Sequence, residues 1–233
     1  MSIPKKKIFC VIPAWNEEAN IVKTLEDVIL FTDEIIVVDD GSTDDTLVLV
    51  NNFAKKTNTK NKKVIALSHI INRGQGAALA TGNELALSLG ADIIFHFDAD
   101  GQFLSTDISK VLEPLLFDEF DVVLGSRFLG LESEMPFSKK NIIMPIARLF
   151  MNFFFNAHLT DPQSGFRALN RGAWEKIDIE QDGMAHCSEI IIKVLKNNLR
   201  VKEVPIKVLY SEYGLGASGG FKIVKDLFLR KIS

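Results

Sequence analysis

Cysteine, charge of one sign and long hydrophobic runs are all scarce in this sequence. Its two cysteines, Cys10 and Cys187, lie far apart without CxxC spacing, which excludes a disulfide framework and favours a reducing compartment. The 27 basic and 30 acidic residues nearly balance, so no uniform positive field is available to bind a nucleic acid. At 233 residues the chain fits one α/β domain, which we expect to extend over 1–233.

Hydrophobic segments are too short or too interrupted to direct the chain into a membrane. The N-terminal apolar run IFCVI (8–12) is closed by Pro13, so we expect no signal peptide. The longest apolar stretch, 142–159, carries Arg148, Asn152 and Asn156 at every fourth position and therefore has a polar face. A transmembrane helix needs roughly 20 apolar residues in a row. We therefore expect a cytoplasmic protein without a transmembrane helix.

What is present instead is a regular alternation of short apolar runs and amphipathic stretches. The runs predict strands at 8–12, 34–39, 63–67, 93–97 and 121–125, and the stretches predict helices at 17–31, 43–56, 74–89 and 106–117. Continuous apolar strands separated by helices are typical of an α/β fold with a mostly parallel central sheet and helices on both faces. In such sheets, ligands bind beyond the carboxyl ends of the strands.

The pattern is looser after residue 125. We expect the interrupted helix at 142–159, a strand at 164–169, a helix at 188–196 and an extended segment at 201–210. The end of the chain, 215–233, predicts a basic amphipathic helix. Amphipathic helices such as these two either pack on the sheet or lie in a membrane surface, which would make the protein peripheral on the cytoplasmic membrane face.

The stretch IIFHFDADGQ (93–102) ends an apolar strand on two carboxylates. Alternation along an extended chain places Asp98 and Asp100 on the same side, and Gln102 follows if the extension continues. Adjacent anions repel each other, and a hard divalent cation, Mg²⁺ or Mn²⁺, relieves the repulsion. Because such ions share their coordination with phosphates, the pattern indicates a bound diphosphate.

Other interpretations of these acids remain. A lone Asp-x-Asp also fits a solvated turn. A phosphoaspartyl phosphatase would need its nucleophile on the first strand, which here runs into Pro13-Ala14-Trp15-Asn16-Glu17. A receiver domain, whose acidic pair resembles Asp39-Asp40, would be about half as long as this chain.

Six motifs taken together are more specific than any one of them. The segments IPAWNEEANI, VVDDGSTDDT, NRGQGAALATG, DADGQF, VLGSRF and DPQSGFRAL occur in an order and spacing that resemble the family 2 glycosyltransferases with a GT-A fold. Within that family they resemble the dolichyl-phosphate mannose and glucose synthase branch. The resemblance extends over about 8–214, and it implies a Rossmann-like nucleotide-sugar-binding half at 8–125 and an acceptor half at 126–214.

The resemblance also implies residue roles in the first half. Asp40 resembles the acid that accepts a hydrogen bond from the base, and Gln102 resembles a third metal ligand beside Asp98 and Asp100. The residues implied for nucleotide-sugar binding are Pro13, Trp15, Glu17, Asp39, Asp40, Arg73 and Asp98.

In the second half, arginines and one carboxylate are implied. Arg127 and Arg167 would neutralise the departing phosphate and, with Ser164, bind the acceptor. Asp161 would act as general base toward a hydroxyl acceptor, or would only orient the site if the acceptor is a lipid phosphate. His186 and Glu189 lie near this loop in sequence, and both also fit structural roles.

The sequence thus predicts a metal-dependent inverting glycosyltransferase that moves a hexose from a UDP- or GDP-linked sugar to a polyprenyl phosphate. Transfer to a hydroxyl of a glycan, or nucleotide-sugar binding without turnover, are the alternatives. The segment YSEYGLGASGG departs from the mannose synthase pattern, which leaves the sugar open.

Overall fold

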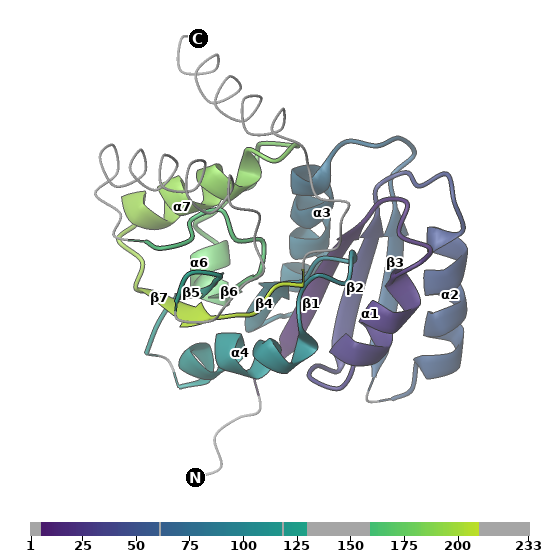
Figure 1. Ribbon diagram of the computed structural model, residues 1–233, viewed down its shortest axis with the longest axis horizontal. Helices are drawn as coiled ribbons and strands as arrows, with labels where there is room; N and C mark the ends of the chain where they lie inside the picture. Colours follow the sequence, from purple (N-terminus) through teal and green to yellow (C-terminus); the bar gives the residue numbers. More distant parts are fainter. Residues whose placement is uncertain (1–5, 61, 118, 130–158, 210–233) are drawn as a thin grey trace.

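The computed structural model describes residues 6–60, 62–117, 119–129 and 159–209, and its centre is a seven-stranded sheet (Figure 1). The strands lie in the order β3-β2-β1-β4-β6-β5-β7. Their bounds are β1 Ile8–Ala14, β2 Glu34–Asp39, β3 Lys63–Ser68, β4 Ile93–His96, β5 Val122–Ser126, β6 Arg167–Asn170 and β7 Val201–Pro205.

The sheet is parallel at β1 to β4 and mixed at β5 to β7. The pairs β1–β2, β2–β3 and β1–β4 are parallel, so their carboxyl ends meet at one edge. Strand β6 runs antiparallel to both its neighbours, β4 and β5, whereas β7 is parallel to β5. Because of this reversal, β6 begins at the edge where β1, β2, β4 and β5 end.

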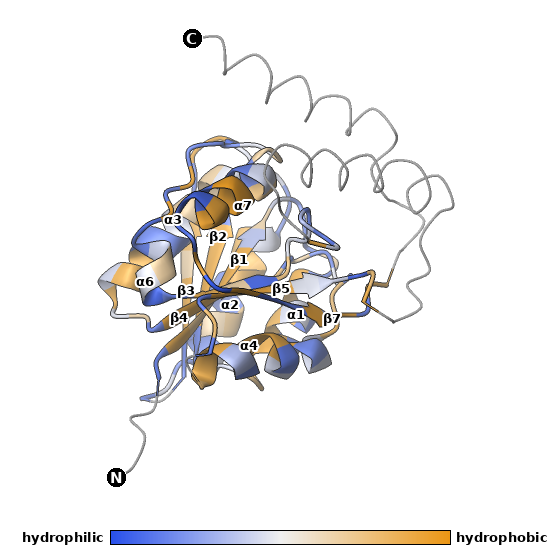
Figure 2. Ribbon diagram, turned by 90° about the vertical axis from the view of Figure 1, so that its left-hand side faces the viewer, coloured by the Kyte–Doolittle hydropathy of each residue, from blue (hydrophilic) through white to orange (hydrophobic). Residues whose placement is uncertain are grey.

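Helices cover both faces of the sheet, and each face has its own hydrophobic core. On one face lie α1 (Ile21–Val28), α2 (Thr46–Thr57) and α4 (Ile108–Leu116), the last preceded by the 3-10 turn η1 (Ser105–Asp107). On the other face lie α3 (Gln75–Ser88), α6 (Arg171–Trp174) and α7 (His186–Lys196). Figure 2 shows α3, α6 and α7 across the sheet from α4.

Strand β1 shows why an unbroken apolar run forms a central strand. Cys10 and Ile12 belong to one core, while Phe9 and Val11 belong to the other, and all four are fully buried. Helix α3 approaches so closely that a Cβ on Gly82 would lie 2.3 Å from Val11 Cγ1. The side chains on both faces of this central strand therefore have to be apolar, as the sequence pattern predicted.

The predicted α/β fold is confirmed, with differences at element boundaries. Helices α1 and α2 begin later than predicted because the residues ahead of them tie two loops together. Ser42 Oγ accepts a hydrogen bond from Asn16 N (2.9 Å), and Asp44 Oδ2 accepts one from Glu18 N (3.1 Å). The predicted amphipathic helices at 142–159 and 215–233 lie outside the described residues, apart from Leu159. Among the residues that the structure describes, no helix is long and apolar enough to cross a bilayer.

Candidate active site

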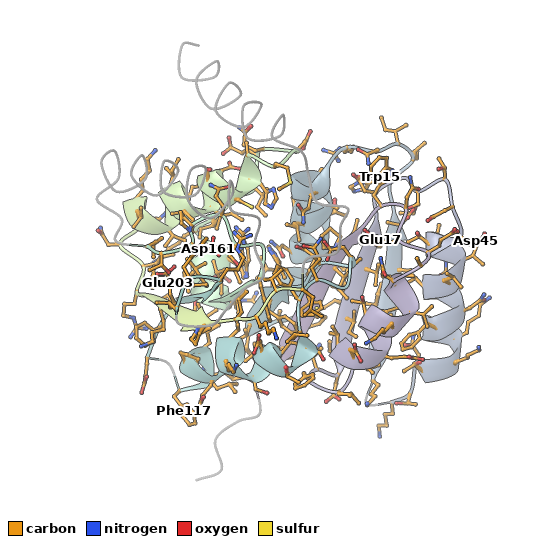
Figure 3. All side chains as sticks on the ribbon, viewed as in Figure 1. Trp15, Glu17, Asp45, Phe117, Asp161 and Glu203 are labelled. Carbon is orange, nitrogen blue, oxygen red and sulfur yellow. The ribbon has the colours of Figure 1, made fainter. Side chains whose placement is uncertain are left out.

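The predicted site residues gather at the edge of the sheet where the parallel strands end. Trp15 and Glu17 follow β1, Asp40 follows β2, and Asp98 and Asp100 follow β4. Loops from the second half reach the same edge because β5 ends there and β6 begins there. In Figure 3, Trp15 and Glu17 lie over the β1–β2 side, and Asp161 and Glu203 lie together on the other side.

Both carboxylate oxygens of Asp40 contact other groups of the protein. Asp40 Oδ1 contacts His69 Nδ1 (2.7 Å) and accepts from Arg73 N (3.0 Å), and Oδ2 accepts from Gly74 N (2.7 Å). The side chain is buried. Asp40 therefore shapes the loop between β3 and α3, which differs from the role that the resemblance implied for it, accepting from a base.

The neighbouring Asp39 has a carboxylate oxygen that can accept a further hydrogen bond. Its Oδ2 accepts from Ser68 Oγ (3.0 Å), but its Oδ1 is buried and has no hydrogen-bond partner among the described residues. A buried carboxylate oxygen without a donor is costly unless a ligand supplies one. Asp39 thus has a buried oxygen that is able to receive a donor from a ligand.

Two other predicted nucleotide residues are exposed. The side chain of Trp15 is 54% exposed, so a ring face is available at the rim. Arg73 is exposed as well and lies 3.5 Å from Asp182, with which it forms an ion pair. Pro13 lies within β1, and Glu17 accepts a hydrogen bond from Asn20 Nδ2 (3.0 Å).

The chain turns sharply between the two acids of DADGQ. Strand β4 ends at His96, a turn covers Ala99 and Asp100, and Gly101 has a φ of 72°, a backbone conformation that glycine adopts without strain. The expected extension through Gln102 is therefore not observed. Instead, the backbone N–H of Gln102 donates to Asp100 Oδ1 (3.0 Å).

The two carboxylates still lie close enough to interact. Burial and the negative charge of Asp100 raise the pKa of Asp98 to about 7. The pKa of Asp100 is also raised, mainly by burial. Asp98 Oδ1 accepts from Gln75 Nε2 (2.9 Å), which fixes the orientation of the carboxylate. A raised pKa caused by burial and a nearby like charge marks a pair that a cation would stabilise.

The residues fit a hard divalent cation held in part by a substrate. Within the described ranges, no three His, Cys, Asp or Glu side chains form a metal-binding group. Asp98 and Asp100 offer carboxylate oxygens, the ligands that Mg²⁺ and Mn²⁺ prefer. Gly165 packs closely against Asp98, because a Cβ there would lie 2.9 Å from Asp98 Oδ2. Two neighbouring carboxylates suit an ion that completes its coordination with phosphate oxygens.

On the acceptor side, Asp161 and Arg127 form a buried ion pair. Arg127 Nε donates to Asp161 Oδ2 (2.6 Å) and Arg127 Nη2 donates to Oδ1 (2.7 Å), while the backbone N–H of Arg127 also reaches Oδ2 (3.1 Å). Asp161 is fully buried, and the Arg127 side chain is 20% exposed. This bidentate geometry orients the guanidinium, which is one of the two roles expected for Asp161.

Arg167 is the first residue of β6 and is fully buried. Its Nη2 donates to Cys187 Sγ (3.0 Å), while Nη1, like Ser164 Oγ, has no partner among the described residues. Burial raises the pKa of the Cys187 thiol, but the positive charges of Arg167 and His186 outweigh burial and lower it to about 6. Arg167 therefore supplies a buried positive charge that is close enough to act on Asp98.

Several residues hold the site together through contacts that the sequence does not reveal. Glu189 accepts from the backbone N–H groups of Glu180 and Gln181, so its role is structural. The loop that it holds presents Asp182 O to the first amides of α3, Gly76 N (2.8 Å) and Ala77 N (3.2 Å). Gln75, which holds Asp98, and the amides of Gly76 and Ala77 lie within one of the six motifs, whereas Glu189 and Asp182 do not.

A mostly parallel sheet with paired acids beyond its carboxyl edge suits an enzyme that binds a phosphorylated ligand and a divalent cation at that edge. The family model described as glycosyl transferase family 2 matches residues 9–178. The chain belongs to this family and is a glycosyltransferase, which confirms the class that the six motifs predicted.

Similar proteins and structures agree with this assignment. An uncharacterized protein of Methanocaldococcus jannaschii is 41% identical over 245 residues, which cover 99% of this chain and 94% of that protein. The UDP-N-acetylglucosamine–dolichyl-phosphate N-acetylglucosaminyltransferase of Methanococcus voltae is 37% identical, with 97% of each chain covered. Glucosyl-3-phosphoglycerate synthase from Mycobacterium tuberculosis, crystallised with Mn²⁺, uridine diphosphate and phosphoglyceric acid, matches with a TM-score of 0.71 and 20% identity over 97% of this chain and 78% of that one. The last similarity confirms the GT-A fold.

Proposed function

We propose that this enzyme transfers a sugar from a UDP-linked donor to a polyprenyl phosphate, with a divalent metal ion at Asp98 and Asp100. The observation that carries the proposal is the Arg127–Asp161 pair, in which both carboxylate oxygens accept hydrogen bonds from Arg127. A hydroxyl acceptor requires a base, and Asp161 is held by an arginine instead. A phosphate acceptor is already ionised at neutral pH, since its second pKa is near 6, and needs no base.

The donor side follows from the placement of Asp39 and Trp15. Asp39 Oδ1, which is buried and has no partner within the described part of the chain, would accept the ring N–H of uracil. The exposed face of Trp15 would stack on the ring. The Methanococcus voltae relative is named for a UDP-linked sugar and a dolichyl phosphate, which supports this choice of donor and acceptor.

Asp98 and Asp100 would hold Mg²⁺ or Mn²⁺ together with the diphosphate, and Gln102 remains a candidate for a further ligand. When bound, the ion would neutralise charge that develops on the leaving diphosphate. Arg127 would bind the acceptor phosphate and add positive charge at the same point. Ser164 and Arg167, each with a buried donor that has no partner in the ranges that the structure describes, would support the acceptor side.

The segments 142–159 and 215–233 supply a route to the lipid. Their apolar faces and basic residues suit a membrane surface, so we propose that the enzyme works as a peripheral protein on vesicles that contain its acceptor.

The test combines ligand binding with transfer. Thermal unfolding is measured with UDP-, GDP- and dTDP-linked sugars, with and without Mn²⁺, for the wild type and Asp100→Ala. A ligand at 100 times its Kd stabilises the native state by about 2.7 kcal/mol. We expect the UDP-linked sugar to raise the Tm in a Mn²⁺-dependent way, and Asp100→Ala to remove the Mn²⁺-dependent part.

Transfer of labelled sugar is then measured to polyprenyl phosphate in vesicles, to the matching polyprenol and to a soluble glycan. Transfer to the phosphate alone is expected. Transfer to the polyprenol or the glycan would refute a phosphate acceptor, and nucleotide-sugar binding with no transfer to any of the three would indicate a binding module.

A further inference from the structure

Strand β7 carries an acidic side chain that does not point into solvent. Glu203 lies in the middle of β7, the last strand in the sheet order. Its Oε1 accepts from Thr160 N (3.0 Å) and Asp161 N (2.8 Å), and its Oε2 accepts from Thr160 N (2.8 Å). One carboxylate thus holds two successive backbone amides of a loop more than 40 residues earlier in the chain.

The loop that Glu203 holds is the one that presents Asp161. Beside these amides, Thr160 Oγ1 is 2.6 Å from Ser126 Oγ at the end of β5, which joins the loop to the residue before Arg127. Asp161 in turn fixes the guanidinium of Arg127 through two hydrogen bonds. Glu203 is therefore connected to Arg127 through Asp161, whose backbone N–H donates to Glu203 and whose carboxylate accepts from Arg127.

The chemistry of these contacts favours a carboxylate at position 203. Backbone amides that donate to a charged acceptor form shorter and stronger bonds than those that donate to a neutral one. A carboxamide has only one accepting oxygen, and its NH₂ group would face an N–H donor. The buried Asp161 cannot shift without breaking its bidentate pair with Arg127, so the position of the loop decides the position of the guanidinium.

We propose that Glu203 is a positioning residue for Arg127, acting through the backbone of Thr160 and Asp161. Figure 3 shows Glu203 and Asp161 next to each other, in agreement with the hydrogen bond between Glu203 and the Asp161 amide. This inference rests on the proposed function for the role of Arg127 in binding the acceptor phosphate. The contact itself, between Glu203 and the loop, is tested separately.

The first measurement is amide hydrogen exchange in the full-length protein. In Glu203→Gln we expect exchange at Thr160, Asp161 and Arg127 to be at least tenfold faster than in the wild type, because each of these amides donates to a carboxylate of the connection. Glu203→Asp keeps the charge but is one methylene shorter, so it should fold and show an intermediate increase. Unchanged exchange at Thr160 and Asp161 in both variants would refute the contact.

Transfer kinetics then separate positioning from stability. In Glu203→Gln we expect kcat/KM for polyprenyl phosphate to fall about tenfold, as loss of one charge-assisted hydrogen bond predicts, while KM for the nucleotide sugar is unchanged. The matched control is Asp121→Asn, because Asp121 also accepts a backbone N–H, from Arg200 (2.9 Å), but precedes β5 at the opposite edge of the sheet. The control should lower the Tm and leave transfer unchanged.

A double-mutant cycle completes the test. If Glu203 acts through Arg127, Glu203→Gln has no further effect on transfer in an Arg127→Ala background, and additive effects would show that it acts independently. If the wild type transfers no sugar at all, the proposed function fails, whereas the exchange measurement still decides whether Glu203 fixes the loop.

Discussion

At the scale of single residues, Asp98 shows how one carboxyl group is left dependent on a ligand. It is oriented by Gln75, partly buried, and placed beside Asp100, and desolvation and the neighbouring negative charge raise its pKa to about 7. The unfolded chain would ionise this group near its ordinary value of 3.8. Between these two pH values the folded state holds the extra proton, so the ligand-free protein loses stability as pH rises from about 4 to 7.

This pKa predicts a pH-dependent metal affinity. A cation competes with the proton on Asp98, so the affinity for Mn²⁺, measured with saturating UDP-N-acetylglucosamine, should be about tenfold weaker at pH 6 than at pH 8. Isothermal titration calorimetry at several pH values provides the measurement. Asp98→Asn should bind Mn²⁺ more weakly at every pH and lose the tenfold difference. A wild-type affinity that is flat between pH 6 and pH 8 would contradict the assignment of Asp98 to the metal.

The adjacent acids Asp39 and Asp40 show how two identical residues acquire different tasks. Successive side chains at the end of a strand point in opposite directions. Asp40 is therefore enclosed by the loop 69–74, whereas Asp39 keeps one buried oxygen to which no described residue donates.

Substitution should separate the two tasks. Asp40→Asn places an NH₂ group among backbone donors and should lower the free energy of unfolding by about 2 kcal/mol, measured in urea. Asp39→Asn should unfold like the wild type but bind UDP at least tenfold more weakly, measured by calorimetry. The assignments would be reversed if Asp40→Asn kept its stability and lost UDP binding instead.

The sequence predicted these acids but not their partners. DADG and DDGS stand out because acidic residues follow apolar strands, and that signal is local. The donors that decide the role of each acid lie elsewhere in the chain, as with Arg73 N and Gly74 N for Asp40 or Gln75 for Asp98. Only the folded chain brings these groups together, so residue types could be predicted, while roles such as that of Asp40 could not.

At the scale of elements, the beginning of α3 joins the two halves of the protein. The first amides of a helix have no partner within the helix, and a phosphate is one group that satisfies them. Here the carbonyl oxygen of Asp182 accepts from Gly76 N and Ala77 N instead. The approach is so close that a Cβ on Gly76 would lie 1.9 Å from Gln181 O.

Gly76→Ala should therefore displace the loop 181–182. The clash is with backbone, which cannot rotate away, and we expect the free energy of unfolding to fall by about 2 kcal/mol. Gly172→Ala is the matched control, because the nearest atom to a Cβ there is Asn170 Oδ1 at 3.7 Å. Alanine favours a helix over glycine, so the control should keep or gain stability in the same urea experiment. Equal losses in the two variants would contradict the close contact.

Elements were predicted better than their ends. Apolar runs such as 34–39 gave a strand directly, because a strand buried on both faces needs apolar residues throughout. Helix α2 begins at Thr46 rather than near residue 43, because Ser42 and Asp44 bond to residues 16 and 18 across the site. Such contacts between loops are invisible in a periodic pattern.

At the scale of the whole molecule, the predicted mostly parallel sheet with helices on both faces is confirmed, and the position of β6 is the feature that the sequence did not reveal. A strand of four residues gives no indication of its direction. Its antiparallel pairing with β4, His96 beside Arg167 and Ile93 beside Asn170, decides that the segment containing Asp161 and Ser164 reaches the same edge as Asp98. The sequence thus predicted which residues belong to the site. The antiparallel direction of β6, which the sequence did not reveal, brings the residues of the two halves together.

The reversal of β6 also brings the two ends of one long connection side by side. The chain leaves the sheet at the end of β5 and returns to it at the start of β6, and these two strands are neighbours. A change in the length of the connection between residues 129 and 159 would therefore require no change in the register of the described strands. We expect such a change to alter the acceptor and to leave the donor half unaltered.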